Sequence, residues 1–188
     1  MPKPILLLRH PDTPATVPTP WVRFERDGAV LRITFRIPGD TTMVALPSRI
    51  EPRVKQSAAR RADGLWEHTC FECFVRPDGA KDYLEFNFSP SMEWAAYRFD
   101  DYREGMHNAE LPVPAIVATP WRNRFELSAR VDLPEEWARR ALSVNFAAII
   151  EDKDGNKSYW ALAHTNPEKP DFHHPDCFAL ELPAPDGA

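Results

Sequence analysis

The chain has 188 residues, of which 43% are apolar and 27% are charged, and its formal net charge is −5 at pH 7. These values are ordinary for a soluble globular protein, and the length fits one domain spanning residues 1–188. An acidic balance without a long block of Lys or Arg argues against a nucleic-acid partner. The 20 prolines stand mostly at the ends of apolar runs, which favours short strands and turns over long helices.

The lengths of the apolar runs predict the cellular setting. The first run, residues 5–8, is too short for the apolar region of a signal peptide. No run approaches the ~20 apolar residues of a transmembrane helix, so no membrane association is expected. Without a signal peptide, the three cysteines are expected to be reduced thiols. We therefore predict a cytoplasmic protein, whose oligomeric state the sequence does not specify.

The first part of the chain alternates apolar and polar residues with the period of β-strands. Residues 1–20 are predicted to be a partly extended connector that contains a first short strand. Asp27-Gly28 is a hairpin signal, and the strand after it has an apolar stripe. The stripe consists of Leu31, Ile33, Phe35 and Ile37. Strands are predicted over residues 5–9, 21–26, 29–37 and 42–46, followed by a loop over residues 48–64.

The stretch from Leu65 to Phe99 contains three alternating runs, residues 69–76, 83–88 and 94–99, joined by short loops rich in Pro, Gly, Asp and Ser. A turn at Pro77-Asp78-Gly79 places Glu72 opposite Asn87. A return through residues 89–91, with Phe88 opposite Glu93, places Asn87 opposite Trp94. This register gathers six side chains on one sheet face: Glu72, Tyr83, Glu85, Asn87, Trp94 and Arg98.

That face has two interpretations. Polar strand faces usually meet water, which predicts a solvated surface on which Arg98 offsets the two carboxylates. Alternatively, carboxylates, amides and guanidinium groups match sugar hydroxyls, and aromatic rings stack on a pyranose. The residues alone leave both interpretations open.

The remainder of the chain is predicted to complete an all-β fold. Phe125, Leu127, Ala129 and Val131 form one inward stripe, and Asp154-Gly155 is a hairpin turn. Pro134–Arg140 is the one helix signal, with Pro at its start and acidic residues in its first turn. Strands are predicted over residues 115–119, 124–133, 142–151, 157–163 and 176–182, with a tail at 183–188. The fold class is therefore an antiparallel β-sandwich with one short helix.

The motifs LWEHTCFECF, residues 65–74, and YLEFNFSP, residues 83–90, resemble those of DOMON-like β-sandwiches of immunoglobulin-like jelly-roll form. They are most similar to the family-9 carbohydrate-binding modules, and the looser similarity extends from about Trp21 onward. The resemblance implies a β-sandwich that binds saccharide ends between two Trp side chains, with carboxylate, amide and Arg groups on the hydroxyls. It is a non-catalytic activity, and no cofactor is expected.

The resemblance also implies the binding residues. Trp66 and Glu72 match the family pattern, Arg98 matches its arginine, and Trp160 is the second stacking Trp. The family's acidic residue at the start of the first strand is replaced here by Thr69 or Cys70, which is a departure that affects sugar specificity. The predicted ligand-binding set is Trp66, Glu72, Glu85, Asn87, Arg98, Trp160 and His164.

Other functions remain as alternatives. Some DOMON-like domains hold haem, for which Met92, Met106, His68 and His107 are possible axial donors. A small hydrolase is the second alternative, with Asp171 and His173 of the loop 164–176 as an acid–base pair, or with Glu72 and Glu85 performing glycoside chemistry.

A metal site is disfavoured by strand geometry. Cys70 and Cys73 lie within one alternating strand, so their side chains should point to opposite faces and not form a single chelate. His68, His173, His174 and Cys177 are further possible donors. We expect no metal.

Overall fold

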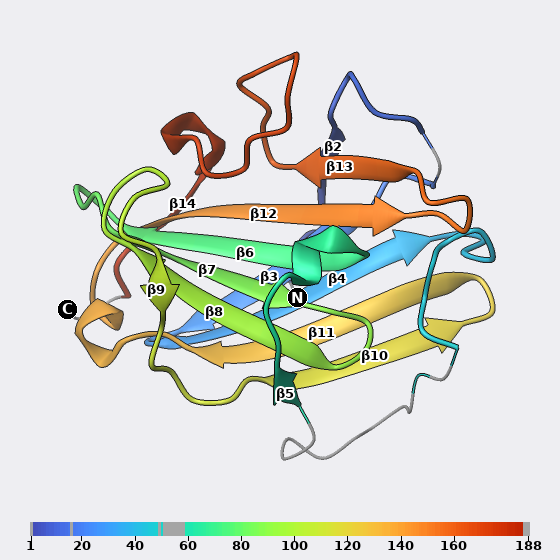
Figure 1. Cartoon of the computed structure of the whole chain (residues 1–188). Helices are drawn as coiled ribbons and strands as arrows, with labels where there is room; N and C mark the ends of the chain where they lie inside the picture. Colours follow the sequence, from blue (N-terminus) through green and yellow to red (C-terminus); the bar gives the residue numbers. More distant parts are fainter. Residues whose placement is uncertain (1, 16, 49, 51–58, 186–188) are drawn as a thin grey trace.

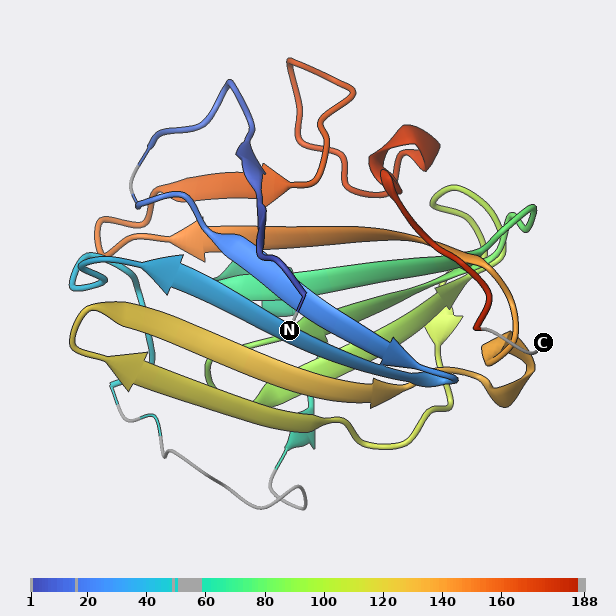
Figure 2. The same ribbon diagram turned by 180° about the vertical axis from the view of Figure 1, so that it is seen from behind.

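The computed structural model describes residues 2–15, 17–48, 50 and 59–185. Within these residues the chain forms two sheets packed face to face (Figures 1 and 2). All their strand pairs are antiparallel except one, the parallel pair of β5 with β8. The predicted β-sandwich is confirmed. No described helix has the length and apolar character needed to cross a membrane.

The five-stranded sheet, seen from its outer side in Figure 2, has the order β1-β3-β4-β11-β10. Its strands are β1 (Ile5–Leu6), β3 (Trp21–Asp27), β4 (Val30–Pro38), β10 (Ala115–Trp121) and β11 (Arg124–Asp132). The hairpin of β3 and β4 turns at Gly28, whose φ of 57° favours glycine. Both predicted stripes, on β4 and on β11, are buried against the second sheet, so the alternation predicted these strands correctly.

The nine-stranded sheet carries the site. It has the order β2-β13-β12-β6-β7-β8-β5, with β14 pairing with β12 and β9 with β8. Its strands are β2 (Leu8–Arg9), β5 (Arg60–Arg61), β6 (Cys70–Pro77), β7 (Tyr83–Phe88), β8 (Glu93–Phe99), β9 (His107–Asn108), β12 (Leu142–Glu151), β13 (Lys157–Ala161) and β14 (Leu180–Leu182). Figure 1 shows this sheet in front, with the 3₁₀ turn η2 (Leu65–Glu67) lying over it.

The predicted first strand, residues 5–9, is divided between the two sheets. β1 pairs with β3 in one sheet, and β2 pairs with β13 in the other. Leu7 lies between them, buried, and its N–H donates to the Pro20 carbonyl oxygen at 3.0 Å. The segment therefore joins the sandwich at one edge.

Two further predictions differ from the structure. Residues 42–46 make only an isolated bridge, Val44 with Asp152. The helix predicted at Pro134–Arg140 is only a 3₁₀ turn, η3 (Glu135–Trp137). Trp137 is buried, and its backbone N–H donates to the Pro134 carbonyl oxygen three residues earlier, at 2.9 Å. Two other 3₁₀ turns occur in the described part, η2 and η4 (Pro175–Cys177). Much of the predicted loop 48–64, and the end of the tail 183–188, lie outside the described residues.

The register between β6 and β7 is the predicted one, whereas that between β7 and β8 is shifted by one residue. Glu72 pairs with Asn87, as expected. Asn87, however, pairs with Ala95 and not with Trp94. The cause is the connecting loop, in which Ser89 N–H donates to Glu93 O and Met92 adopts a φ of 69°. Three residues therefore make the turn instead of four, a length that places a left-handed residue at its end.

The shift reverses the faces of β8. Trp94 now belongs to the main core between the sheets, and Arg98 lies on that side as well. Ala95, Tyr97 and Phe99 instead share the outer face with Glu72 and Glu85, where a second apolar cluster forms. This outer face is covered by residues 162–179 and by η2, with Phe172, Phe178 and Leu65 packed on it. The predicted solvated surface is therefore largely buried.

Candidate functional site

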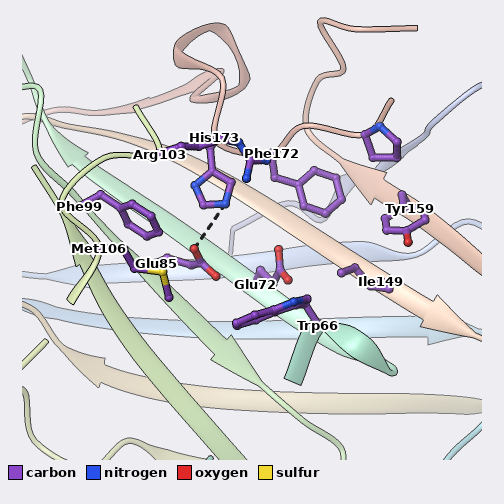
Figure 3. Close-up of a pocket in the computed structure, with 11 residues that line it drawn as sticks. Trp66, Glu72, Glu85, Phe99, Arg103, Met106, Ile149, Tyr159, Phe172 and His173 are labelled. Atoms are coloured by element: carbon purple, nitrogen blue, oxygen red, sulfur yellow. Dashed lines mark ion pairs between the residues drawn. The ribbon is translucent and has the colours of Figure 1, made fainter. Parts of the chain in front are cut away.

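A cavity of about 370 Å³ opens on the outer face of the nine-stranded sheet (Figure 3). Its floor comes from the strands, and its walls come from η2, the loop after β8 and the loop after β13. The lining residues are Trp66, Glu72, Glu85, Phe99, Arg103, Met106, Ile149, Tyr159, Pro170, Phe172 and His173. A pocket of this volume suits a small organic ligand.

Two carboxyl groups lie on the floor of the pocket. Glu72 on β6 is 3% exposed and Glu85 on β7 is 5% exposed. Their strands are hydrogen-bonded neighbours in which Glu72 faces Asn87, so Glu85 is the diagonal neighbour of Glu72. Asn87 is fully buried and directs its side-chain N–H to Glu85 at 2.6 Å. Figure 3 shows both carboxyl groups projecting between Trp66 and the pair Phe172 and His173.

Glu85 contacts His173 on the opposite wall. The Nε2 atom of His173 lies 3.5 Å from a carboxyl oxygen of Glu85 (dashed in Figure 3). Burial raises the pKa of Glu85 to about 7, against the opposing effects of the Asn87 hydrogen bond and the Arg103 charge. Burial, followed by the Arg103 charge, lowers the pKa of His173 to about 4. His173 is therefore neutral at neutral pH, and the contact is not a fixed ion pair.

The other ring nitrogen of His173 determines its tautomer. Its Nδ1 atom lies 2.8 Å from the Tyr83 hydroxyl, which also accepts the Arg103 backbone N–H at 3.3 Å. The Tyr83 proton is then free to point toward Nδ1, which leaves the imidazole proton on Nε2, facing Glu85. The Tyr83 hydroxyl thus links the Arg103 backbone to the His173 ring, and the opposite ring nitrogen faces Glu85 at 3.5 Å.

Glu72 differs from Glu85 in its surroundings. It makes no hydrogen bond or ion pair with any residue that the structure describes, although it is almost fully buried. Burial raises the pKa of Glu72 well above its usual range, Glu85 raises it further, and Arg103 lowers it. Buried carboxyl groups are normally paired, so this group has hydrogen-bonding capacity directed only toward the cavity.

The arginine of the pocket is Arg103, in the loop between β8 and β9. Its φ of 56° is unusual for a residue with a side chain. Its guanidinium group donates to Asp171 at 2.8 Å, and Tyr102 donates to the same carboxylate. These bonds join the loop after β8 to the loop after β13, so the two walls of the pocket support each other.

Aromatic rings form most of the walls. Trp66 on η2 is 38% exposed, and its ring meets Tyr97 edge to face with centroids 6.0 Å apart. Phe172 lies on the far side of the carboxyl groups (Figure 3), and it contacts Tyr159, with centroids 6.3 Å apart. Phe99 is fixed by stacking on Tyr83 at 4.7 Å. The pocket therefore offers ring faces above a polar floor.

The structure brings together part of the predicted binding set. Trp66, Glu72 and Glu85 line the pocket, and Asn87 lies beneath it as the partner of Glu85. Arg98 does not reach the pocket. Because of the register shift it points to the opposite face of the sheet, where it bonds Asp82 at 2.7 Å and lies over the Trp137 ring.

Trp160 and His164 also lie elsewhere. Trp160 is 3% exposed in the core between the sheets, because its partner on β12, Ala148, belongs to the inner face. Its neighbour Tyr159 takes the outward position and lines the pocket. His164 bonds the Leu8 carbonyl oxygen at 2.8 Å, and so fixes the loop after β13 to the N-terminal segment.

The alternative sites are separated by the fold. Of the four possible haem donors only Met106 lines the pocket, while Met92 is part of the core and His68 bonds Glu151. Cys70 and Cys73 lie on opposite faces of β6, as predicted, and the described residues contain no group of three potential ligands suited to a metal ion. The side chain of Asp171 is bound to Arg103 and Tyr102 rather than to the His173 ring.

Arg103, Phe99, Tyr159 and Phe172 were absent from the predicted set. Phe99 and Tyr159 could have been found from strand alternation with the correct register. Arg103 lies in a polar turn whose sequence gives no sign that it folds over the sheet.

The sequence matches no protein-family model and no curated protein. Solved structures do share the fold. One is described as a "putative carbohydrate-binding protein" from Bacteroides uniformis, with a TM-score of 0.67, 16% sequence identity, and coverage of 93% of this chain and 82% of that chain. The two chains have the same fold. Another is a family 9 carbohydrate-binding module from Caldicellulosiruptor kristjanssonii in complex with cellotriose, with a TM-score of 0.49, 10% identity, and coverage of 86% and 73%. The likeness to the Bacteroides uniformis structure confirms, as a fold, the β-sandwich that the sequence resemblance implies.

Proposed function

We propose that this protein is a non-catalytic binding module for a saccharide or a similar polyol, which it holds in the pocket on the outer face of the nine-stranded sheet. The observation that carries the proposal is the combination of exposed Trp66 and buried Glu72 and Glu85 in one cavity. An aromatic ring stacks on the apolar face of a pyranose, while carboxyl groups bind its hydroxyls. The fold shared with a protein described as carbohydrate-binding supports the proposal by analogy.

The pose follows from the walls of the pocket. Trp66 provides the stacking surface on one side, and Phe172, with Tyr159 beside it, bounds the other side. Glu72 and Glu85 both face the hydroxyls along one edge of the sugar ring. The two carboxyl groups are able to carry a single proton between them, so one group donates to a hydroxyl while the other accepts. This arrangement replaces the two-Trp sandwich predicted from the sequence.

The proposal is tested by calorimetric titration of the protein with a panel of mono- and disaccharides. Trp66→Ala should weaken binding about tenfold, since removing the ring takes away the apolar surface that the sugar buries, and fully burying an aromatic side chain contributes ~1.5–3 kcal/mol. Trp121→Ala is the matched control, because Trp121 is 49% exposed on the other sheet. Equal losses in both variants, or no binding of any saccharide, would contradict the proposal.

A second candidate function is acid–base hydrolysis of a glycoside. It is favoured by one observation, that the pKa of Glu85 is raised to about 7 within a cavity, as suits a general acid near neutral pH. Turnover of nitrophenyl glycosides that is lost in Glu85→Gln would support this function. Binding of the sugar part without turnover would favour the non-catalytic module.

A further inference from the structure

The pocket is short of positive charge. Its described lining contains one permanent cation, Arg103, and the guanidinium group of this residue is already bonded to Asp171 at 2.8 Å. His173 is neutral at neutral pH because burial lowers its pKa to about 4. Glu72 and Glu85 therefore face the cavity without a cation of their own.

Glu72 is the group that a ligand has to satisfy. It is 3% exposed, lines the cavity, and has no bonding partner among the described residues. Its strand partner Asn87 does not bond to it: Asn87 directs an amide N–H to Glu85, and its oxygen accepts from the Cys70 thiol at 3.4 Å. Burying a carboxyl group without a hydrogen-bond donor costs free energy. A donor supplied by the ligand therefore contributes more binding free energy at Glu72 than elsewhere in the pocket.

The walls are suited to a cation as well as to a sugar. Trp66, Phe99, Tyr159 and Phe172 surround the carboxyl groups, and aromatic faces attract ammonium groups that lie within about 6 Å of the ring. A protonated amine would thus meet a carboxylate below it and aromatic faces beside it.

We propose that the ligand of this pocket is an amino sugar whose ammonium group binds Glu72. The inference rests on the proposed function, because it names the class of saccharide for the same pocket. With neutral hydroxyls Glu72 and Glu85 share one proton and no cation balances the remaining charge, whereas an ammonium group compensates a full negative charge and donates up to three hydrogen bonds.

Binding of the ammonium group should also release a proton, and this release can be measured. Burial and the neighbouring Glu85 raise the pKa of Glu72, so without ligand this carboxyl group keeps its proton to a higher pH than an ordinary one. When the ammonium docks, the carboxylic acid loses its proton to solvent and the resulting carboxylate pairs with the unchanged ammonium. Of the other groups near Glu72, Arg103 favours this ionisation. Tyr159 and Cys70 stay neutral, because burial and then the Glu72 charge raise their pKa values.

The experiment compares glucosamine, glucose and N-acetylglucosamine by calorimetry at about pH 6.5, where the amine is largely protonated. Glucosamine should bind about tenfold or more tightly than the two neutral sugars. Titrations in two buffers of different ionisation enthalpy should show proton release with glucosamine and less with glucose. Glu72→Gln should remove the preference for glucosamine, and Glu25→Gln, which removes the same charge from the exposed face of the other sheet, should retain it.

The outcomes separate the inference from the proposed function. Glucose binding as tightly as glucosamine would overturn the inference and leave the saccharide module intact. Retention of the preference in Glu72→Gln, or glucosamine binding to the wild type without proton release, would also overturn it. Binding of none of the three sugars would overturn the inference, and the panel of mono- and disaccharides would then decide the proposed function. The proton measurement needs only the wild-type chain, so it decides the matter even if the variant does not fold.

Discussion

His173 Nε2 lies 3.5 Å from the Glu85 carboxyl group, yet the two residues do not form an ordinary ion pair. Burial moves the pKa of Glu85 up to about 7 and that of His173 down to about 4. Each group is therefore held in its neutral form over the range in which the other would normally carry a charge. The contact places a titratable pair in the pocket without a permanent charge.

The first prediction concerns pH and stability. His173 binds its proton more weakly in the folded chain, so its contribution to stability is lost as pH falls from its usual 6.5 toward 4. Glu85 binds its proton more tightly when folded, so its contribution is lost as pH rises from 4.5 toward 7. The two slopes oppose each other between about pH 4.5 and 6.5.

When one member of the pair is removed, the pH dependence of the free energy of unfolding should show the contribution of the other member. In Glu85→Gln the free energy of unfolding should rise with pH from about 4.5 to 6.5 relative to the wild type, by up to ~3 kcal/mol. In His173→Gln it should fall over the same range. Urea denaturation at several pH values measures both differences. In Glu85→Gln the loss of the Glu85 charge also lowers the pKa of Glu72, which changes the pH dependence of stability in the same direction. Parallel profiles for the three proteins would show that the pair does not titrate as described.

Much of the fold follows from alternation. The period of two located β4, β6, β7, β11 and β12 within a residue or two, and it set the register of β6 against β7 through the Pro77-Asp78-Gly79 turn. The register of β8 depended on a detail that alternation does not contain. Met92 has a left-handed backbone that a residue with a side chain rarely adopts, so the sequence favoured a turn that was one residue too long.

That single residue accounts for part of the error at the site. It moved Arg98 away from the pocket and brought Phe99 to it. Another part of the error comes from long-range packing. Arg103 and Phe172 reach the pocket through loops that fold back over the sheet and join at Asp171, and neither loop has a periodic pattern from which its position could be deduced.

The two arginines give the second prediction. Arg103→Ala should weaken saccharide binding by about tenfold, because it frees Asp171 and releases the contact between the two walls. Arg98→Ala should change the affinity less than twofold, since its bond to Asp82 and its packing on Trp137 lie on the other side of the sheet. Calorimetric titration of both variants measures this. A larger loss of affinity in Arg98→Ala than in Arg103→Ala would place Arg98 on the pocket face of the sheet, as the register predicted from the sequence does.

The third prediction separates the two tryptophans by stability. Trp160 is buried and its indole N–H donates to Ser158 at 2.9 Å, so Trp160→Ala should lower the free energy of unfolding by ~3–5 kcal/mol. Trp66→Ala should cost less than ~1 kcal/mol, because Trp66 is 38% exposed. Urea denaturation compares them. Trp160→Phe, which keeps a ring in the core, is the control that should bind the ligand as the wild type does, and a loss of affinity in this folded variant would place Trp160 at the site after all.

The fourth prediction concerns the loop that carries Arg103. Gly105 has a φ of 67°, and a Cβ atom there would lie 2.1 Å from the Asp100 carboxylate. Gly79 has a similar φ of 72°, but a Cβ atom on it would meet nothing within 4 Å. Both alanine substitutions should incur the ~1–2 kcal/mol cost of a left-handed alanine. Only Gly105→Ala should also displace the loop.

The displaced loop should carry Arg103 and Met106 with it, so Gly105→Ala is expected to be less stable than Gly79→Ala and to bind the ligand more weakly. Denaturation and calorimetry on the two variants test this, with Gly79→Ala providing the conformational cost alone. If the two variants lose the same stability and bind equally well, Asp100 moves aside without disturbing the loop. In that case the position of Arg103 depends on its own bonds to Asp171 and Tyr83 rather than on the close approach at Gly105.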